Sequence, residues 1–365
     1  MVQNHIKLEE IHTTYGHEYY LWSIDGKSLP EYLQGWAAAF PDEKRVRELA
    51  PFSGLWPAWT RNLEWEGDVR FVWKAIELDK AVLPLLLCPD DADFTCIVVA
   101  TEVEKTEDFV YWHKLGFVLH DREDFAEEKK NGILKLEAYS DEDWEKYGDN
   151  IALEEVNSPA WYQWIGENWA EELYRRRMNY TLPYYQTEGN VFWMKDADWV
   201  FDRHEYESMV EEYWELETLG QLERFNPGKK LTIRECADMI CGLTRHGREA
   251  LEEHLRDYQD ILLHIFAGEN ISEPLSYLLK CDSASERGIR IYCRAIEIMW
   301  RYGDDAVVNV VDVTILEYLS YENSLWQKFG TYISEEFRTY INKDVLPYNL
   351  MMGGVMPLQN PGMCG

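Results

Sequence analysis

The chain has 365 residues, with 36 lysines and arginines against 67 aspartates and glutamates, so its formal net charge is −31. A surface that neutralises phosphates needs a basic excess, so this balance argues against DNA or RNA binding. The first residues carry no apolar signal core, and no stretch reaches the ~18 uninterrupted apolar residues of a membrane span. The sequence therefore predicts a cytoplasmic protein that does not contact a membrane.

The first predicted elements lie near the N-terminus. Alternating aromatic residues before Asp25-Gly26 predict a strand that leads into a tight turn. Ser28, followed three places later by Glu31, has the spacing of a capping box and predicts the start of a short helix.

The middle of the first part predicts a sheet. Residues 69–78 alternate in polarity and predict a strand, and two or three adjacent strands are expected between 83 and 118. A further strand is expected at 133–139. A helix is expected at 160–178, because Ser158-Pro159 is a favourable helix start and the tryptophans that follow share one face.

Residues 191–202 are expected to form a strand or a loop, and an acidic helix is expected from Arg203 to Leu219. Beyond Gly228 the pattern is helical throughout. Within that part, the β-branched stretch 307–320 is assigned to a helix because no turn signal divides it. The expected fold class is α+β: an N-terminal mixed sheet with helices, followed by an all-α helical domain.

A change of composition places the expected domain boundary at Asn226-Pro227-Gly228. Residues 1–228 carry a net charge of −25 and fourteen of the sixteen tryptophans, whereas residues 229–365 carry −6. We therefore expect an acidic, tryptophan-rich domain at 1–228 and a helical domain at 229–345. The Gly- and Pro-rich residues 346–365 are expected to form a flexible tail.

Familiar catalytic and cofactor motifs are missing. The seven cysteines include no CxxC pair, which predicts reduced thiols and no zinc site. GxSxG, GxGxxG, P-loop and HExxH patterns do not occur, so no cofactor is expected. Asp90, Asp91 and Asp93 lie within four residues at a predicted turn. Turn formation is the favoured interpretation, with contact to a partner or a bound metal ion as alternatives.

The acids and aromatic residues of the first part suggest a binding surface. Between Glu137 and Glu155 there are eight acids and one lysine. Tryptophans fill cores, but they also anchor interfaces, so both a core and a partner-facing role stay open. The residues predicted to contact a basic protein partner are Asp90, Asp91, Asp93, Asp141, Glu142, Asp143, Trp144 and Tyr147.

An acidic, tryptophan-rich chain with turn-joined strands such as LPLLLCPDDADFTCIVV and no catalytic motif resembles the immunity proteins of bacterial toxin–immunity systems. The resemblance covers roughly residues 1–220 and implies a protein that blocks a basic toxin through an acidic surface. The alternative is a metal-dependent hydrolase that uses Asp90, Asp91 and Asp93, with Asp260 and His264 as further candidates, on a phosphorylated substrate.

Overall fold

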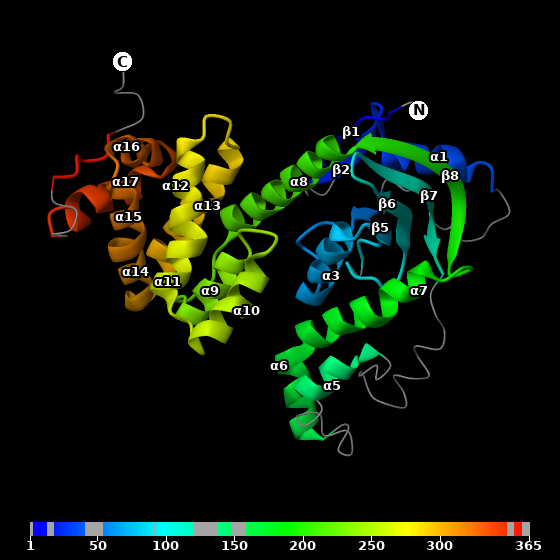
Figure 1. Cartoon of the computed structure of the whole chain (residues 1–365), viewed down its shortest axis with the longest axis horizontal. Helices are drawn as coiled ribbons and strands as arrows, with labels where there is room; N and C mark the ends of the chain where they lie inside the picture. Colours follow the sequence, from blue (N-terminus) through cyan, green and yellow to red (C-terminus); the bar gives the residue numbers. More distant parts are fainter. Residues whose placement is uncertain are drawn as a thin grey trace. The chain divides into compact units, whose positions relative to one another are not determined.

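The computed structural model describes residues 3–12, 18–40, 54–90, 92–119, 138–147, 158–348 and 354–359 (Figure 1). It contains two compact units, Met1–Glu211 and Glu212–Gly365. The first unit combines two sheets with helices, and the second consists of helices. The predicted α+β class is confirmed.

The first sheet has three strands in the order β1–β2–β3, which are Ile6–His12, Glu18–Ile24 and Lys27–Ser28. Asp25 and Gly26 both have positive φ, at 52° and 78°, and form the predicted tight turn between β2 and β3. Helix α1, Leu29–Ala37, follows at once. The Ser28 backbone and hydroxyl both donate to Glu31, as the capping-box spacing predicts.

The second sheet has five strands in the order β4–β5–β6–β7–β8. Their bounds are Trp56–Pro57, Lys80–Leu87, Val98–Lys105, Phe109–Val118 and Val191–Asp202. Every pairing in the described sheets is antiparallel, so the expected mixed sheet is in fact two antiparallel sheets. Two or three strands were expected between 83 and 118, and three are present; residues 191–202 form a strand.

The strand predicted at 69–78 is wrong, because Glu66–Glu77 is helix α3. A short run rich in apolar residues can form either a strand or a buried helix. The apolar residues of this run fit both the two-residue spacing of a strand and the three- to four-residue spacing of a helix. The buried positions Asp68, Val72 and Ile76 repeat every four residues. Gly67 fixes the packing, because a Cβ atom there would lie 2.5 Å from the Ala170 carbonyl oxygen of the neighbouring helix.

Five further helical segments lie between residues 141 and 224: α5 Asp141–Tyr147, α6 Pro159–Arg176, η4 Arg177–Thr181, α7 Leu182–Gln186 and α8 Arg203–Arg224. The predicted start of α6 is confirmed, since Ser158 Oγ accepts the Trp161 N–H. η4 is a π-helical turn that continues α6 without a break. Most of the strand expected at 133–139 lies outside the described residues.

The second unit continues from the end of α8 as a series of helices. They are α9 Ile233–Cys241, α10 Gly247–Tyr258, α11 Leu263–Ala267, η5 Gly268–Ser272, α12 Glu273–Lys280, α13 Glu286–Tyr302, α14 Asp305–Val310, η6 Val311–Ile315, α15 Leu316–Ser320, α16 Asn323–Tyr332, α17 Glu335–Tyr340 and η7 Ile341–Val345. The helical assignment of 307–320 is confirmed. Here a π-helical turn, η6, joins α14 to α15.

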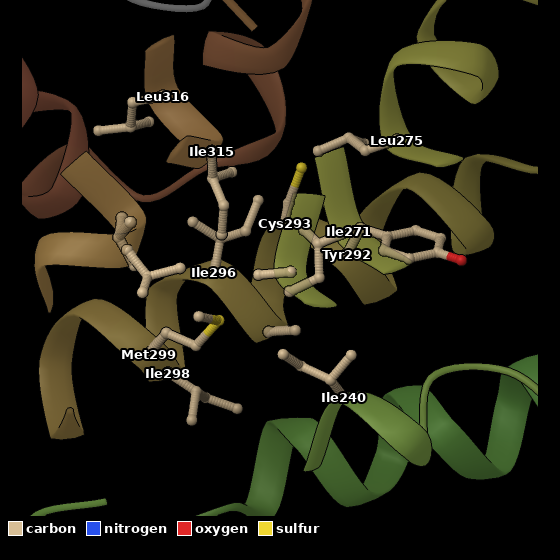
Figure 2. Packing of buried hydrophobic residues seen from close by; sticks show 14 of the residues in the cluster. Ile240, Ile271, Leu275, Tyr292, Cys293, Ile296, Ile298, Met299, Ile315 and Leu316 are labelled. Carbon is tan, nitrogen blue, oxygen red and sulfur yellow. The ribbon is translucent and has the colours of Figure 1, made fainter. Parts of the chain in front are cut away.

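Helix α13 is the centre of this unit and is buried on most of its circumference. Ile296, Ile298 and Met299 have almost no exposed surface, and they meet side chains from α9, η5, α12 and η6 (Figure 2). Ser285 Oγ accepts the Gly288 N–H and so caps the first turn, and Gly303 follows the last residue. An apolar helix of this kind stabilises the unit by removing its surface from water.

The boundary between the units lies inside α8, whereas the change of composition lies at Asn226-Pro227-Gly228. Part of the expected flexible tail is described, at residues 354–359. Leu358 is buried there, its N–H donates to Asn342 Oδ1 at 2.9 Å, and its carbonyl accepts from Asn342 Nδ2 at 3.0 Å. These contacts attach this segment to the helices of the second unit.

The structure describes six cysteines, four of them buried, and Cys364 lies outside that part of the chain. The reduced state of the thiols stays a prediction. Among the described helices, none is both apolar enough and long enough to cross a membrane.

A capping box with an added lysine closes the start of α9. The Thr232 N–H donates to Glu235 Oε2 at 3.0 Å, and Lys229 Nζ lies 2.5 Å from Glu235 Oε1. The hydrogen bond from Lys229, followed by those from Thr232, lowers the pKa of Glu235 to about 2.

We expect the stabilising effect of Glu235 to depend on pH. A carboxyl whose pKa is lower in the folded state stabilises the fold above its unfolded pKa of about 4.3, and that contribution disappears as the pH falls toward 2. Urea unfolding of the wild type and of Glu235→Gln should therefore differ at pH 7 and converge at acid pH. Glu223→Gln, at an exposed position, is the control, and a difference independent of pH would contradict the prediction.

Candidate functional site

Asp93 stabilises the turn between β5 and β6 through its own hydrogen bonds. Asp93 Oδ1 accepts the Thr95 N–H at 2.8 Å and the Thr95 hydroxyl at 2.7 Å. Ala92 has a φ of 49°, in the left-handed region. Asp90 is exposed, and Asp91 lies outside the described residues. For Asp93, the structure supports the turn interpretation.

Within the described part of the chain, no group of three or more His, Cys, Asp or Glu side chains could hold a metal ion. His264 contacts Thr314 Oγ1 at 2.6 Å and Asn309 Nδ2 at 3.4 Å, both from the neighbouring helical segment α14–η6. The hydrolase alternative stays a prediction, and metal analysis of the purified protein, before and after Asp90→Ala, would test it.

The predicted acidic strip on α5 faces partly outward and partly inward. Asp141 and Glu142 are exposed. Asp143 instead accepts the Ser140 N–H at 3.0 Å and lies 3.0 Å from Arg175 Nε. Burial opposes its ionisation, but the bonds from Ser140 and Arg175 outweigh burial and lower the pKa of Asp143. Asp143 is thus engaged inside the unit.

Trp144 and Tyr147 are the other two residues of α5 that were predicted to contact a partner. Trp144 is half-buried and packs against Tyr139, with their ring centroids 5.0 Å apart. Tyr147 is the last residue of α5, and its side chain lies outside the described part of the structure. The outward-facing part of the strip therefore consists of Asp141, Glu142 and the exposed Glu145.

Behind α5 lies a buried polar network. Glu172 has no exposed surface; it accepts a hydrogen bond from the Tyr139 hydroxyl and another from Arg175 Nη1 at 2.6 Å. The guanidinium of Arg175 also lies over the Tyr139 ring, 4.4 Å from its centroid. This network attaches α5 to α6 and gives Asp143 a structural role.

A second buried ion pair joins α3 to η4. Asp68 has no exposed surface, and its Oδ1 lies 2.7 Å from Arg177 Nε. Burial raises the pKa of Asp68, although Arg177 acts in the opposite direction. Asp68 Oδ2 is buried and has no hydrogen-bond partner among the described residues. The sequence analysis missed this pair because its members are 109 positions apart.

Arg175 and Arg177 each hold an acid from a different element. Arg175, which contacts Asp143, and Arg177, which contacts Asp68 near the β5–β6 turn, are two positions apart in one continuous helical segment. Side chains two positions apart in a helix project in nearly opposite directions. Asp143 and Asp68 are therefore held on different sides of this segment.

Half of the indole rings before residue 228 are buried in a core. Of the fourteen tryptophans before residue 228, seven are buried, six are half-buried, and only Trp65, at 40 %, is exposed. Trp112 is fully buried, with its ring centroid 6.3 Å from that of Trp22 and 6.2 Å from that of Trp199. The core interpretation is thus correct for these rings, and the partner-facing one is wrong for them.

In the second unit, helix α10 carries an acidic face. The exposed positions on this face, continued to Asp260 beyond the helix end, are Glu249, Glu252, Glu253, Arg256, Asp257 and Asp260. They repeat every three or four residues and so share one side of the helix. Five of the six are acids, and this set is named the α10 face below.

The α10 face places like charges next to one another. Glu249, Glu253 and Asp257 are spaced four residues apart, which makes their side chains neighbours and their repulsion mildly destabilising. In the described part of the chain, none of the three has an ion-pair partner. Three adjacent uncompensated acids therefore project into solvent.

Two exposed apolar side chains lie at the end of the α10 face. Tyr258 is 44 % exposed and Leu262 is 41 % exposed. Beneath them, His254 is 4 % exposed, and its Nε2 accepts the Leu262 N–H at 3.1 Å. The sequence analysis did not identify the acids of α10 as a group, because the net charge of the second part is low. Their four-residue spacing is nevertheless visible in the sequence.

Comparison with known proteins gives one match. A family model described as a domain of unknown function, DUF7674, matches residues 244–347, which is under a third of the chain and includes the whole of the α10 face. No curated protein and no solved structure matches the chain significantly.

Proposed function

We propose that the protein is a cytoplasmic protein-binding module that holds a basic partner through its acidic surface. The observation that carries this proposal is the α10 face, where five acids accompany one arginine and Glu249, Glu253 and Asp257 lack ion-pair partners in the described residues. A basic partner would replace this repulsion by attraction and would be steered toward the face by the net charge of −31.

In the form suggested by the resemblance to immunity proteins, the partner is a basic toxin and binding blocks its activity. The test is to express the product of the neighbouring gene alone and together with this protein. Growth arrest that this protein relieves supports the proposal. If the neighbouring product is harmless, or if it stays toxic in the presence of this protein, the immunity role is overturned and only the binding role remains to be tested.

Neutralising the α10 face should weaken binding of a cationic probe by about ten-fold, because three modest ion pairs together account for a factor of that order. The variant is Glu249→Gln, Glu253→Gln and Asp257→Asn. The probe is a decalysine peptide, and its affinity is measured at salt concentrations from roughly 50 to 300 mM, a range over which the screening of charges increases.

The matched control removes the same charge from α5: Asp141→Asn, Glu142→Gln and Glu145→Gln. Loss of affinity confined to the α10 variant supports the proposed face. Equal losses in both variants would indicate diffuse attraction to the net charge, and a larger loss in the α5 variant would assign binding to the acidic strip predicted from the sequence.

A further inference from the structure

We propose that two copies of the protein pair edge to edge through β1, with the two strands antiparallel and related by a two-fold axis at Leu8. Lys7 of each copy then lies opposite Glu9 of the second copy. The pairing does not depend on the proposed basic partner, because β1 and α10 belong to different units.

Strand β1 has one long side without a neighbouring strand. Along Ile6–His12 it pairs with β2 on one side, and among the described elements none lies alongside the other side. Proteins usually interrupt such edges with bulges, prolines or very short strands. Strand β8, at the edge of the other sheet, has two shifts in register, and its Asp198 has a φ of 48°. β1 instead keeps one unbroken register over seven residues and contains no proline.

The hydrogen bonds around β1 show which backbone groups point outward. The Asp25 N–H donates to the His5 carbonyl at 2.9 Å, so the odd-numbered residues of this segment bond to β2. The even-numbered residues then direct their N–H and C=O groups away from β2. Within the described part of the chain, the outward groups of Ile6 and Leu8 have no hydrogen-bond partner. They are available to a further strand.

The charges beside Leu8 are opposite in sign and uncompensated. Lys7 and Glu9 are both exposed, and neither has an ion-pair partner among the described residues. Because side chains alternate along a strand, these two project from the same face, one on each side of Leu8. The strand therefore carries a cation and an anion at equal distances from a central apolar residue.

This pattern makes β1 complementary to itself in one register. A two-fold axis perpendicular to the sheet places residues at equal distances from the axis opposite each other. With the axis at Leu8, each Lys7 meets a Glu9. With the axis at Lys7, two lysines face each other, and at Glu9 or Glu10 two glutamates do, which is destabilising. The charges therefore favour the Leu8 register and a second copy of this chain as the added strand.

The same register agrees with the direction of the backbone groups. Leu8 points its N–H and C=O outward, so the two Leu8 residues can exchange a pair of hydrogen bonds across the axis. Lys7 and Glu9 of the second copy then form a non-hydrogen-bonded pair, the kind in which facing side chains lie closer together. Each dimer would contain two such ion pairs.

Charge reversal tests the pairing with the full-length protein. Sedimentation velocity is measured from roughly 5 to 300 µM protein, because edge contacts are small and such interfaces are weak. The salt concentration is about 0.15 M, where the Debye length of about 8 Å screens much of the repulsion between two acidic chains. We expect a concentration-dependent dimer of the wild type. Lys7→Glu or Glu9→Lys alone should weaken it at least about ten-fold, since like charges then face each other twice.

Mixing the two single variants provides the decisive comparison. In an equimolar mixture, Lys7→Glu and Glu9→Lys chains again present opposite charges to each other at both pairs, so dimers should reappear. Lys195→Glu makes the same change of charge at an exposed position on β8 and should leave the wild-type dimer unchanged.

Three results would overturn the proposal. A wild type that is monomeric at every concentration would leave the β1 edge to a strand from a different protein. Single variants that dimerise like the wild type, or a mixture that does not regain the dimer, would exclude the Leu8 register. An equal loss in Lys195→Glu would show that the total charge, and not β1, controls association.

Discussion

Replacing Arg177 with methionine should lower the free energy of unfolding of the first unit by about 3–5 kcal/mol, the usual result of removing one partner from a buried ion pair. Asp68 has no exposed surface, and Arg177 Nε, 2.7 Å away, is the hydrogen-bond donor to its Oδ1. Without that guanidinium the carboxylate would be charged, buried and unpaired. Urea unfolding followed by tryptophan fluorescence measures the loss.

The matched control is the double variant Asp68→Asn with Arg177→Met, which removes the buried charge and should recover most of the loss. The pH dependence gives an independent check. Burial raises the pKa of Asp68, so the ionised form is disfavoured in the folded state. The loss of unfolding free energy caused by Arg177→Met should therefore be complete at neutral pH and become smaller as acid protonates Asp68. A deficit below about 1 kcal/mol, or one unchanged by acid, would contradict this account of the pair.

Replacing Trp112 with alanine should cost about 3–5 kcal/mol, as expected for a large aromatic side chain removed from a core. Trp112 is fully buried, and its ring centroid lies 5.4 Å from that of Phe201 and 6.3 Å from that of Tyr206. The change would leave a cavity and remove several edge-to-face contacts. Denaturant unfolding of the purified variant measures the cost.

Two variants check the origin of that effect. Trp112→Phe should retain most of the stability, because it keeps a ring and removes an indole N–H that has no partner among the described residues. Trp65→Ala, at a position 40 % exposed, should change stability by about 1 kcal/mol or less. Similar losses from Trp65→Ala and Trp112→Ala would contradict the assignment of the buried tryptophans to the core.

Local signals in the sequence predicted much of the fold. The Asp25-Gly26 turn, the capping box of Ser28 and Glu31 and the cap at Ser158 each depend on residues close together in the chain, and all three are present. The helical second part was likewise visible, because its apolar residues recur at helical spacing over long stretches.

Other features depended on contacts that no local pattern reveals. Residues 69–78 resembled a strand because their apolar residues alternate, and only packing against α6 selects the helix α3. The inward position of Asp143 depends on Arg175, which is 32 residues further along the chain. Tryptophan frequency could not separate a core from an interface, because both environments favour large aromatic rings.

The candidate site was predictable only in its chemistry. A net charge of −31 indicated a basic partner. Because most of that charge lies before residue 228, the binding residues were predicted in the first part. The α10 face was visible as Glu249, Glu253 and Asp257 at a four-residue spacing. That these acids lack ion-pair partners among the described residues required the structure.

The most direct test of the central claim is amide hydrogen–deuterium exchange of the whole protein, with and without the decalysine peptide. We predict slower exchange at residues 247–262 on binding, and unchanged exchange at residues 141–147 on α5. Protection of α5 in place of α10, or an equal change along the whole chain, would contradict the claim that a basic partner binds at the α10 face.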